Sequence, residues 1–377
     1  MATQRIIDFL NTRRLNGPCL VVDLDVVREN YIGFEKALPD SRIFYAVKAN
    51  PAPEILRLLA SLGSSFDTAS VTEIEMALDA GAPAERISYG NTIKKERDIA
   101  RAFELGIRLF AVDSVEEVEK VARAAPGARV FCRVLTDGEG AEWPLSRKFG
   151  CVPAMAVDVL RRAKSLGLNA HGVSFHVGSQ QTDLSAWDRA LGDARGVFAA
   201  LAEEGITLKM VNMGGGFPTR YLRDVPTAQA YGRAIFDALR KHFGNRIPET
   251  IVEPGRGMVG NAGVIKTEVV LVSKKADNDN VRWVYLDIGK FGGLAETMDE
   301  AIRYQIVTPR DGDRTEPCIL AGPTCDSADV MYEKTPYPLP VSLTIGDELL
   351  IEGTGAYTTT YASVAFNGFE PLRSYVI

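Results

Sequence analysis

Residues 42–51 read Arg42-Ile43-Phe44-Tyr45-Ala46-Val47-Lys48-Ala49-Asn50-Pro51. An apolar run rich in aromatic and β-branched residues ends in a lysine, and the Asn-Pro pair then breaks the chain into a loop. The run predicts a buried strand over 42–47 with Lys48 at its carboxyl end.

The same pattern repeats outward from this stretch to about residue 260. Short apolar runs alternate with longer helical patterns, as is typical of parallel βα units. A (β/α)8 TIM-like barrel of about 250 residues fits this span, and the alternative is a doubly wound open sheet. Candidate functional residues follow many different strands, which favours the barrel. The predicted strands are 42–47, 107–112, 128–134, 170–177, 208–213 and 250–252, and the predicted helices are 53–61, 71–80, 115–125, 155–166, 184–204 and 228–243.

Past residue 260 the chain changes to strand-like runs separated by turn residues, with little helix. Residues 19–22, ahead of the barrel, could pair with these strands. We therefore expect a barrel domain over 24–260 and a discontinuous, mostly β domain of the sandwich or barrel type over 1–23 and 261–377. The predicted strands are 264–273, 281–287, 317–320, 339–343 and 347–352.

The composition excludes several classes of protein. The 377 residues are 46% hydrophobic and 24% charged, with a net charge of −6, so there is no basic surplus for nucleic acid or anionic membranes. No apolar run reaches the roughly 18 residues of a membrane span. Five scattered cysteines and three histidines argue against a disulfide framework and against a metal centre. We expect a cytoplasmic protein.

Lys48 is the first candidate for chemistry. A lysine at the carboxyl end of a barrel strand projects into the usual catalytic mouth. Desolvation there favours the neutral amine, which can form a Schiff base. Taken alone, a strand-end lysine in solvent is the commoner case.

Two further segments could bind an anion at the same edge of the barrel. Residues 213–218 read Met-Gly-Gly-Gly-Phe-Pro directly after a predicted strand, and the glycines let backbone N–H groups converge on a phosphate. A flexible βα turn is the alternative. Glu253-Pro254-Gly255-Arg256 follows another strand, where a salt bridge between Glu253 and Arg256 is the simpler interpretation.

Other single signals are weak by themselves. His176 could stack on an aromatic ring beside Ser179, although a strand-end histidine is more often simply hydrogen bonded. Cys325 and Asp326 place a thiol and a carboxylate in one loop, and Tyr357 lies in a glycine turn.

Together these signals match the requirements of pyridoxal 5'-phosphate. The lysine would form the aldimine, while the glycine turns, Ser179 and Tyr357 would bind the phosphate. His176 would stack on the ring. Glu253 would pair with the pyridine nitrogen and keep it protonated, which makes the ring a stronger electron sink.

On these residues the sequence resembles the fold type III pyridoxal-phosphate enzymes, specifically the ornithine/diaminopimelate/arginine decarboxylase family. The resemblance runs from about Cys19 to the C-terminus, in order and with sensible spacing. The segments that carry it are 44–50, 66–70 with Glu73, 176–179, 214–218, 253–256, Cys325-Asp326 and 355–357.

The resemblance implies a role for each matching residue. Lys48 matches the Schiff-base lysine, His176 the ring-stacking histidine and Glu253 the partner of the pyridine nitrogen. Asp67 and Arg133 match polar residues beside the lysine and the cofactor, with Glu73 in support. The residues that match the phosphate site are Ser179, Gly216, Gly255, Arg256 and Tyr357.

The resemblance also implies how substrate is handled. Cys325 matches the thiol that reprotonates the α-carbon after carbon dioxide leaves, and Asp326 matches the carboxylate that binds the distal amine of the substrate. In this family both residues reach across a two-fold interface into the neighbouring site. A homodimer with shared active sites is therefore expected.

The distal group of the substrate follows from the charge of the 325–329 loop. It reads Cys-Asp-Ser-Ala-Asp, in which the anionic Asp326 suits a terminal ammonium, and it has no arginine for a second carboxylate. Residues 291–300 align with the helix that the family uses to measure substrate length. Glu296 is the predicted second acid, with Asp299 or Glu300, or a merely solvated helix face, left open.

These observations predict decarboxylation of L-ornithine to putrescine, in polyamine biosynthesis. Lysine, converted to cadaverine, is a second candidate substrate because it is only one methylene longer, which is worth about 1–3 kcal/mol in a pocket. The alternatives are a diaminopimelate, arginine or carboxynorspermidine decarboxylase of the same fold, or a non-catalytic homologue like the antizyme inhibitors. Retention of Lys48, Glu253 and Cys325 argues against the last.

Overall fold

The structure is a computed structural model that describes residues 2–143 and 148–377. The chain divides into two compact units. The barrel unit comprises Arg28–Pro218 and Val225–Met258, and the sheet unit comprises Met1–Val27, Thr219–Asp224 and Val259–Ile377. The boundaries expected at 23/24 and 260/261 lie within a few residues of these, whereas the assignment of 219–224 to the sheet unit was not expected.

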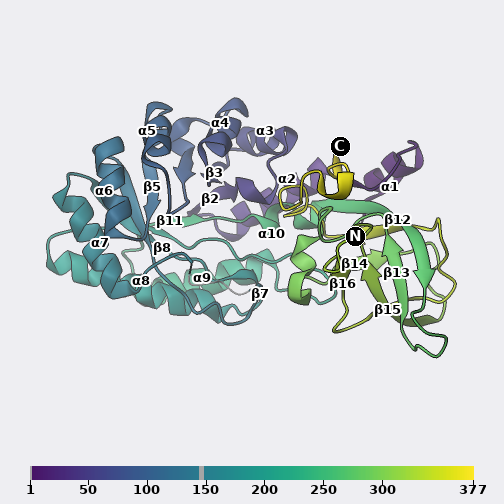
Figure 1. Cartoon of the computed structure of the whole chain (residues 1–377). Helices are drawn as coiled ribbons and strands as arrows, with labels where there is room; N and C mark the ends of the chain where they lie inside the picture. Colours follow the sequence, from purple (N-terminus) through teal and green to yellow (C-terminus); the bar gives the residue numbers. More distant parts are fainter. Residues whose placement is uncertain (1, 144–147) are drawn as a thin grey trace. The chain divides into compact units, whose positions relative to one another are not determined.

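In the barrel unit, eight parallel strands close in the order β10-β11-β2-β3-β4-β5-β6-β8, which confirms the predicted TIM-like barrel (Figure 1). Two of these strands, β3 and β4, were not predicted because they are short and carry polar residues. The barrel strands are β2 Ser41–Ala46, β3 Ser65–Thr68, β4 Ile87–Tyr89, β5 Leu109–Val112, β6 Arg129–Arg133, β8 Asn169–Ser174, β10 Met210–Asn212 and β11 Glu249–Val252. A separate antiparallel pair joins β7 Ala141–Trp143 to β9 Ser179–Gln181.

Most barrel strands are followed by helices, and three of these helices have a first turn capped by a hydroxyl side chain. Ser70 and Ser114 each accept a hydrogen bond from the backbone three residues on, as does Thr227. Among these helices, three were not predicted: α2, which begins in the sheet unit, α5 and the four-residue α10. The helices are α2 Leu24–Ala37, α3 Pro53–Ser61, α4 Val71–Asp79, α5 Glu96–Glu104, α6 Val115–Ala124, α7 Pro153–Ser165, α8 Ser185–Glu203, α9 Ala228–Phe243 and α10 Arg256–Val259.

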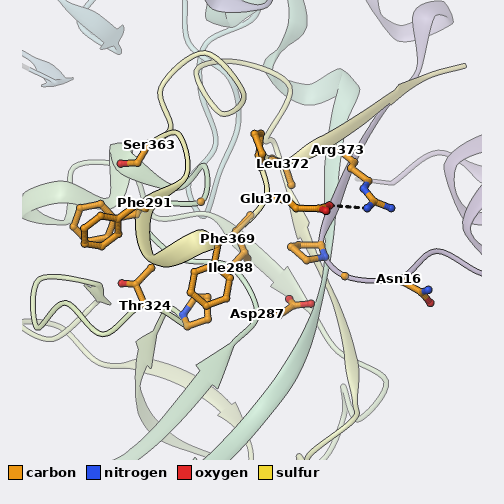
Figure 2. Close-up of a pocket in the computed structure, with 16 residues that line it drawn as sticks. Asn16, Asp287, Ile288, Phe291, Thr324, Ser363, Phe369, Glu370, Leu372 and Arg373 are labelled. Atoms are coloured by element: carbon orange, nitrogen blue, oxygen red, sulfur yellow. Dashed lines mark hydrogen bonds and ion pairs between the residues drawn. The ribbon is translucent and has the colours of Figure 1, made fainter.

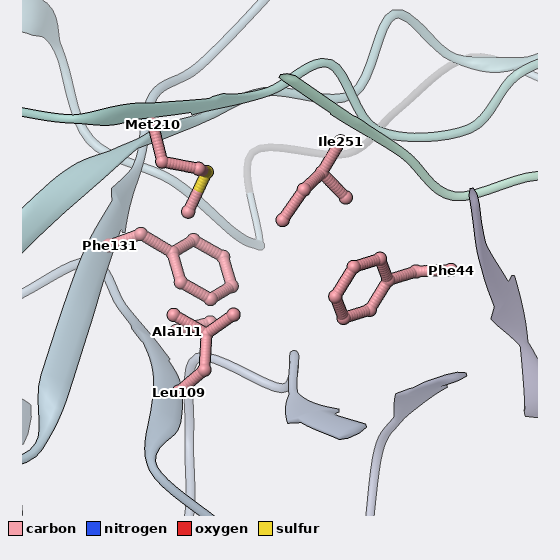
Figure 3. Close-up of a cluster of buried hydrophobic side chains, with 6 residues drawn as sticks. All are labelled: Phe44, Leu109, Ala111, Phe131, Met210 and Ile251. Carbon is pink, nitrogen blue, oxygen red and sulfur yellow. The ribbon is translucent and has the colours of Figure 1, made fainter. Parts of the chain in front are cut away.

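The barrel interior is filled by side chains from five of its strands. Figure 3 shows Phe44 and Phe131 pointing toward each other, with Met210 and Ile251 beside them. Each of these four side chains is at most 1% exposed. Because the interior is packed, ligands have access to the barrel only at its ends.

The sheet unit is built on nine strands, with β12 Gly263–Ser273 at its centre. Strand β1 Cys19–Val22 runs antiparallel to β12, which confirms that 19–22 pairs with the C-terminal strands. Helix α1 Gln4–Asn11 packs Ile6 against Val21 and Val264. The remaining strands are β13 Arg282–Leu286, β14 Gln305–Val307, β15 Thr315–Ala321, β16 Val330–Met331, β17 Tyr337–Pro340, β18 Glu348–Glu352 and β19 Arg373–Val376.

Across the described residues, none of the helices has both the length and the apolar character needed to cross a bilayer.

Candidate cofactor and catalytic site

Lys48 lies just beyond the carboxyl end of β2, on a single 3-10 turn formed by Val47–Ala49. The strand itself ends at Ala46, so the prediction that it reaches Val47 is wrong by one residue. Asn50 anchors this turn, because its carbonyl accepts the Tyr45 hydroxyl at 2.8 Å and its side-chain oxygen accepts the Ala52 N–H at 3.1 Å. The turn therefore places Lys48 directly after the barrel strand β2.

The surroundings of Lys48 differ from the expected desolvated pocket. Val47 and Ala49 are buried, but Lys48 itself is exposed. Lys48 lies among ionisable side chains, because its charge acts on the pKa values of Asp67, Glu253 and His176.

Asp67 sits on β3 and is 8% exposed. The Ser88 hydroxyl donates to it at 3.2 Å, and any side chain at Gly90 would collide with its carboxylate. Burial raises the pKa of Asp67, while Lys48 and Arg133 oppose that rise. The carboxylate is thus held rigidly beside two cations.

Glu73, expected in a supporting role, closes the turn that follows β3. Its carboxylate accepts the Ala69 N–H at 2.7 Å, while its own N–H donates to the Ser70 hydroxyl at 3.2 Å. These reciprocal bonds fix the start of α4 next to Asp67. Burial raises the pKa of Glu73.

Glu253 follows β11 directly and is held by a residue that sequence reasoning missed. The Asn212 side-chain amide donates to Glu253 Oε1, and the Asn212 oxygen accepts the Gly214 N–H at 3.0 Å. Burial and the Asp67 carboxylate raise the pKa of Glu253, whereas Asn212, Lys48 and Arg133 oppose the rise. Asn212 ends β10 at the same edge of the barrel, and that position was its only sequence signal.

His176 lies two residues beyond β8 and has a defined tautomer. Its Nδ1 accepts the Gly178 N–H at 3.1 Å, so any proton on the neutral ring is on Nε2. Burial, together with Arg133 and Lys48, lowers the pKa of His176 well below its ordinary value. A neutral, fixed imidazole is suited to stacking against a flat aromatic ring.

The glycine turn after β10 packs closely against the backbone of its neighbours. A Cβ on Gly215 would lie 2.6 Å from the Glu253 carbonyl and 3.2 Å from His176 Nε2. Gly216 has a φ of +102°, and a Cβ there would lie 2.5 Å from the Gly178 carbonyl. Only glycine fits at these two positions, as expected for a turn that brings backbone N–H groups close to an anion.

A buried cation lies beside this turn. Arg256 is 3% exposed, and its Nε and Nη2 donate to the Ser179 hydroxyl at 3.3 and 3.2 Å. A hydroxyl, a guanidinium and a glycine turn are a suitable donor set for a phosphate dianion. With Glu253, His176 and Lys48 at the same barrel end, these residues fit pyridoxal phosphate.

Cys325 and Asp326 belong to the sheet unit and lie on one loop after β15. Cys325 is exposed, and its N–H donates to the Asn367 side chain at 2.9 Å. Asp326 accepts the Ala328 N–H at 2.8 Å. An exposed thiol can exchange its proton with solvent, as a proton donor must between turnovers.

Asp329 organises this loop and gave no sequence signal. It is 2% exposed, and its carboxylate accepts the Thr324 hydroxyl at 2.7 Å and the Lys290 N–H at 2.8 Å. Gly289 and Gly322 close against it so tightly that a Cβ on either would meet its carboxylate at about 2.1–2.2 Å. The buried carboxylate therefore joins two loops of the sheet unit.

A cavity of about 220 Å³ opens next to this loop (Figure 2). Thr324 lines it, as does Phe291, whose ring lies 4.7 Å from that of Phe366. Figure 2 shows the ion pair between Glu370 and Arg373 on another part of its wall.

The three candidate second acids have different surroundings. The short helix expected here is a 3-10 helix, Ala295–Glu300, which is kinked at Met298 and Asp299. Glu296 is 6% exposed. The Asp299 side chain is 91% exposed and pairs with Lys334, whereas Glu300 binds Arg303 at 2.9 Å and caps the backbone of Lys334. Burial thus singles out Glu296.

Tyr357 is in the turn that follows β18, with a φ of +56°. The turn is braced by the Thr358 hydroxyl, which donates to the Thr354 carbonyl at 2.9 Å. Tyr357, like Cys325 and Asp326, lies in the sheet unit, whereas the other predicted phosphate residues lie in the barrel unit.

A family profile described as "Pyridoxal-dependent decarboxylase, pyridoxal binding domain" matches residues 24–260, the barrel and the site just described. The chain belongs to this family. The predicted resemblance is confirmed, and this decarboxylase is an enzyme that depends on pyridoxal phosphate.

Three similar proteins illustrate the relationship. The decarboxylase is 37% identical over 362 residues to a lysine/ornithine decarboxylase from Selenomonas ruminantium, covering 95% of this chain and 88% of the relative. It is 35% identical over 367 residues to antizyme inhibitor 2 from Xenopus laevis, covering 93% and 78%. The crystal structure of a lysine/ornithine decarboxylase from Vibrio vulnificus complexed with cadaverine superposes with a TM-score of 0.88, at 30% identity and covering 100% of both chains.

Proposed function

We propose that the decarboxylase converts L-ornithine to putrescine and carbon dioxide, and that it also accepts L-lysine, giving cadaverine. The similarity that carries this proposal extends over nearly the whole chain and reaches two proteins named lysine/ornithine decarboxylases. The 325–329 loop supports it with the Asp326 carboxylate and no arginine, which suits a substrate ending in an ammonium group. We further expect a cytoplasmic enzyme, because its described cysteines are all free.

In this proposal the barrel unit holds the cofactor. Lys48 attaches it through the ε-amine, His176 lies against its ring and Glu253 pairs with its ring nitrogen. Asp67 and Arg133 set the charge around the amine. When bound, pyridoxal phosphate supplies an electron sink for the electrons left at the substrate α-carbon. The proposed phosphate ligands are Ser179, Gly216, Gly255, Arg256 and Tyr357.

The sheet unit supplies the substrate residues. Asp326 binds the distal ammonium of ornithine, with Glu296 as the second acid. Cys325 donates the proton from Sγ to the α-carbon once carbon dioxide has left, and its exposure allows it to regain that proton from water. We propose that both residues act in the site of the partner subunit, in a homodimer.

The substrate proposal is tested by steady-state kinetics on ornithine and lysine side by side. Carbon dioxide release is also measured on diaminopimelate, arginine and carboxynorspermidine. We expect the highest kcat/KM for ornithine or lysine. Activity confined to one of the other three amino acids would refute the substrate assignment.

The shared-site proposal is tested by mixing two inactive variants, Lys48→Ala and Cys325→Ala. Random exchange of subunits makes half of the dimers mixed, each with one intact site of two, so about a quarter of wild-type activity should return. No recovery after exchange has been verified by mass spectrometry would mean that each chain completes its own site.

The non-catalytic alternative has a named relative, antizyme inhibitor 2. The presence of Lys48, Glu253 and Cys325 together favours the enzyme. A purified protein that takes up no pyridoxal phosphate, judged by its visible absorbance, would favour the non-catalytic function instead.

A further inference from the structure

Asn212 is buried at the centre of the barrel mouth. It is the last residue of β10 and is 1% exposed. In the barrel register it pairs with Ser174 on β8 and with Ile251 on β11, two residues before Glu253. A buried amide must satisfy both its donor and its acceptor, so its partners decide its orientation.

The two hydrogen-bond partners of Asn212 are Gly214, in the glycine turn, and the Glu253 carboxylate. The Gly214 N–H can only donate, so the oxygen of Asn212 faces it at 3.0 Å. The Asn212 Nδ2 group therefore points the other way and donates to Glu253 Oε1. The Glu253 N–H donates to the Gly214 carbonyl at 2.8 Å and closes a ring of three hydrogen bonds. Asn212 thus joins the glycine turn to the carboxylate.

The hydrogen bond from Asn212 to Glu253 affects the charge of the Glu253 carboxylate. Burial and the nearby Asp67 carboxylate raise the pKa of Glu253, and the Asn212 hydrogen bond opposes the rise. A carboxylate pairs with a protonated ring nitrogen more strongly than a carboxylic acid does. Since Oε1 is occupied by Asn212, Oε2 is the oxygen that remains for the cofactor.

We propose that Asn212 is a positioning residue of this decarboxylase, which favours the carboxylate form of Glu253 by donating to Oε1, directs its Oε2 to the ring nitrogen and couples it to the glycine turn. This inference rests on the proposed role of Glu253. An amide suits all three, because it places one donor and one acceptor on separate atoms of the same short side chain.

The test is a double-mutant cycle between Asn212→Asp and Glu253→Gln. Asn212→Asp keeps the acceptor for Gly214 but places a second carboxylate against Glu253. Adding Glu253→Gln exchanges the positions of the amide and the carboxylate and restores the hydrogen bond. Ser174→Ala, at the same level of the neighbouring strand, controls for general damage to the barrel.

The first readout is thermal unfolding of the cofactor-free protein between pH 5 and pH 9. We expect Asn212→Asp to lower Tm increasingly as pH rises, because two adjacent carboxylates must then ionise. In the Glu253→Gln background this pH-dependent loss should disappear. An equal loss in both backgrounds would overturn the proposal, since a purely structural role does not depend on the charge of Glu253.

The second readout is the dissociation constant of pyridoxal phosphate, measured by absorbance titration. Asn212→Ala and Asn212→Asp should each weaken binding about tenfold, the value of one hydrogen bond to a charged group. Ser174→Ala should leave it unchanged. Unaltered affinity in both Asn212 variants would also overturn the proposal. Full activity of Glu253→Gln alone would instead refute the proposed role of Glu253, while the stability cycle would still test Asn212.

Discussion

In the barrel unit the charged and polar side chains around Lys48 come from the ends of six strands, whereas in the sheet unit Cys325 and Asp326 share one loop. The barrel positions its residues through a closed register of backbone hydrogen bonds, which no single side chain controls. The loop depends on one buried carboxylate, that of Asp329. We therefore expect substitutions in the barrel mouth to lower activity without disturbing the fold. Substitution of Asp329 should instead disturb the conformation of the loop.

The largest effect is expected at Lys48. Lys48→Ala should reduce turnover at least about a thousandfold while the barrel stays folded, because it removes covalent attachment of the cofactor but no packed side chain. Carbon dioxide release measures the loss, and borohydride reduction with peptide mapping shows whether the adduct is gone. Lys95→Ala, at an exposed lysine in the same unit, is the control. An adduct that persists in the variant would place the cofactor on another residue.

The next largest effect is expected in the sheet unit, at Cys325. Cys325→Ala should lower kcat about a hundredfold, the usual contribution of a positioned proton donor, and leave the affinity for pyridoxal phosphate unchanged. Product analysis by mass spectrometry should show misprotonated by-products. Unchanged kcat would remove Cys325 from the proton-donor role and leave the loop with Asp326 alone.

Asp329→Asn tests whether the loop really depends on one carboxylate. The substitution keeps the shape but turns an amide N–H toward groups that are themselves donors, so we expect a loss of about 2 kcal/mol of unfolding free energy. KM for ornithine should rise because Asp326 lies on the same loop. Asp277→Asn, at an exposed carboxylate of the sheet unit, is the matched control. Equal stability of both variants would show that backbone contacts suffice to hold the loop.

The smallest expected effect is a gain in stability, and it comes from a substitution in the barrel mouth, at Glu253. The pKa of Glu253 in the folded protein is raised to about 7. The folded state thus binds this proton more tightly than the unfolded chain, and the stability from it is lost as pH rises from about 4.5 to about 7. Above that window Glu253→Gln should stabilise the cofactor-free protein by roughly 1–2 kcal/mol, a few degrees in Tm, while lowering activity. Differential scanning fluorimetry at pH 5 and pH 8 checks this, and a stabilisation that is equal at both would contradict it.

Elements with a strong apolar pattern were predictable from sequence, but short strands with polar residues were not, and the 14-residue helix α2 was also missed. Pro53–Ser61 and Ala228–Phe243 were predicted to the residue, because a strong apolar periodicity and clear start signals coincide there. Strands β3, Ser65–Thr68, and β4, Ile87–Tyr89, were missed because three or four residues with polar side chains carry no periodicity. Neighbouring barrel strands, not local preference, make them strands.

The same limit applies to the site. Lys48, His176 and Glu253 could be identified because unusual residue types follow predicted strands in a combination that suits one cofactor. Asn212 and Asp329 could not, because an asparagine or aspartate is ordinary in sequence and acquires its role only from its partners. The kink in the short helix that carries Glu296 was likewise not predictable, and it places Asp299 at a left-handed φ of +52°.

The order of strands, helices and reactive residues along the chain determined the family, the cofactor and the edge of the barrel where chemistry takes place. This is possible because the carboxyl ends of parallel strands must meet once the barrel closes. Only the tertiary structure decided that Asn212 braces Glu253, that Asp329 holds the Cys325 loop and that Glu296 is buried while Asp299 is not. Burial and hydrogen-bond partners arise between residues far apart in the chain, so no local pattern can encode them.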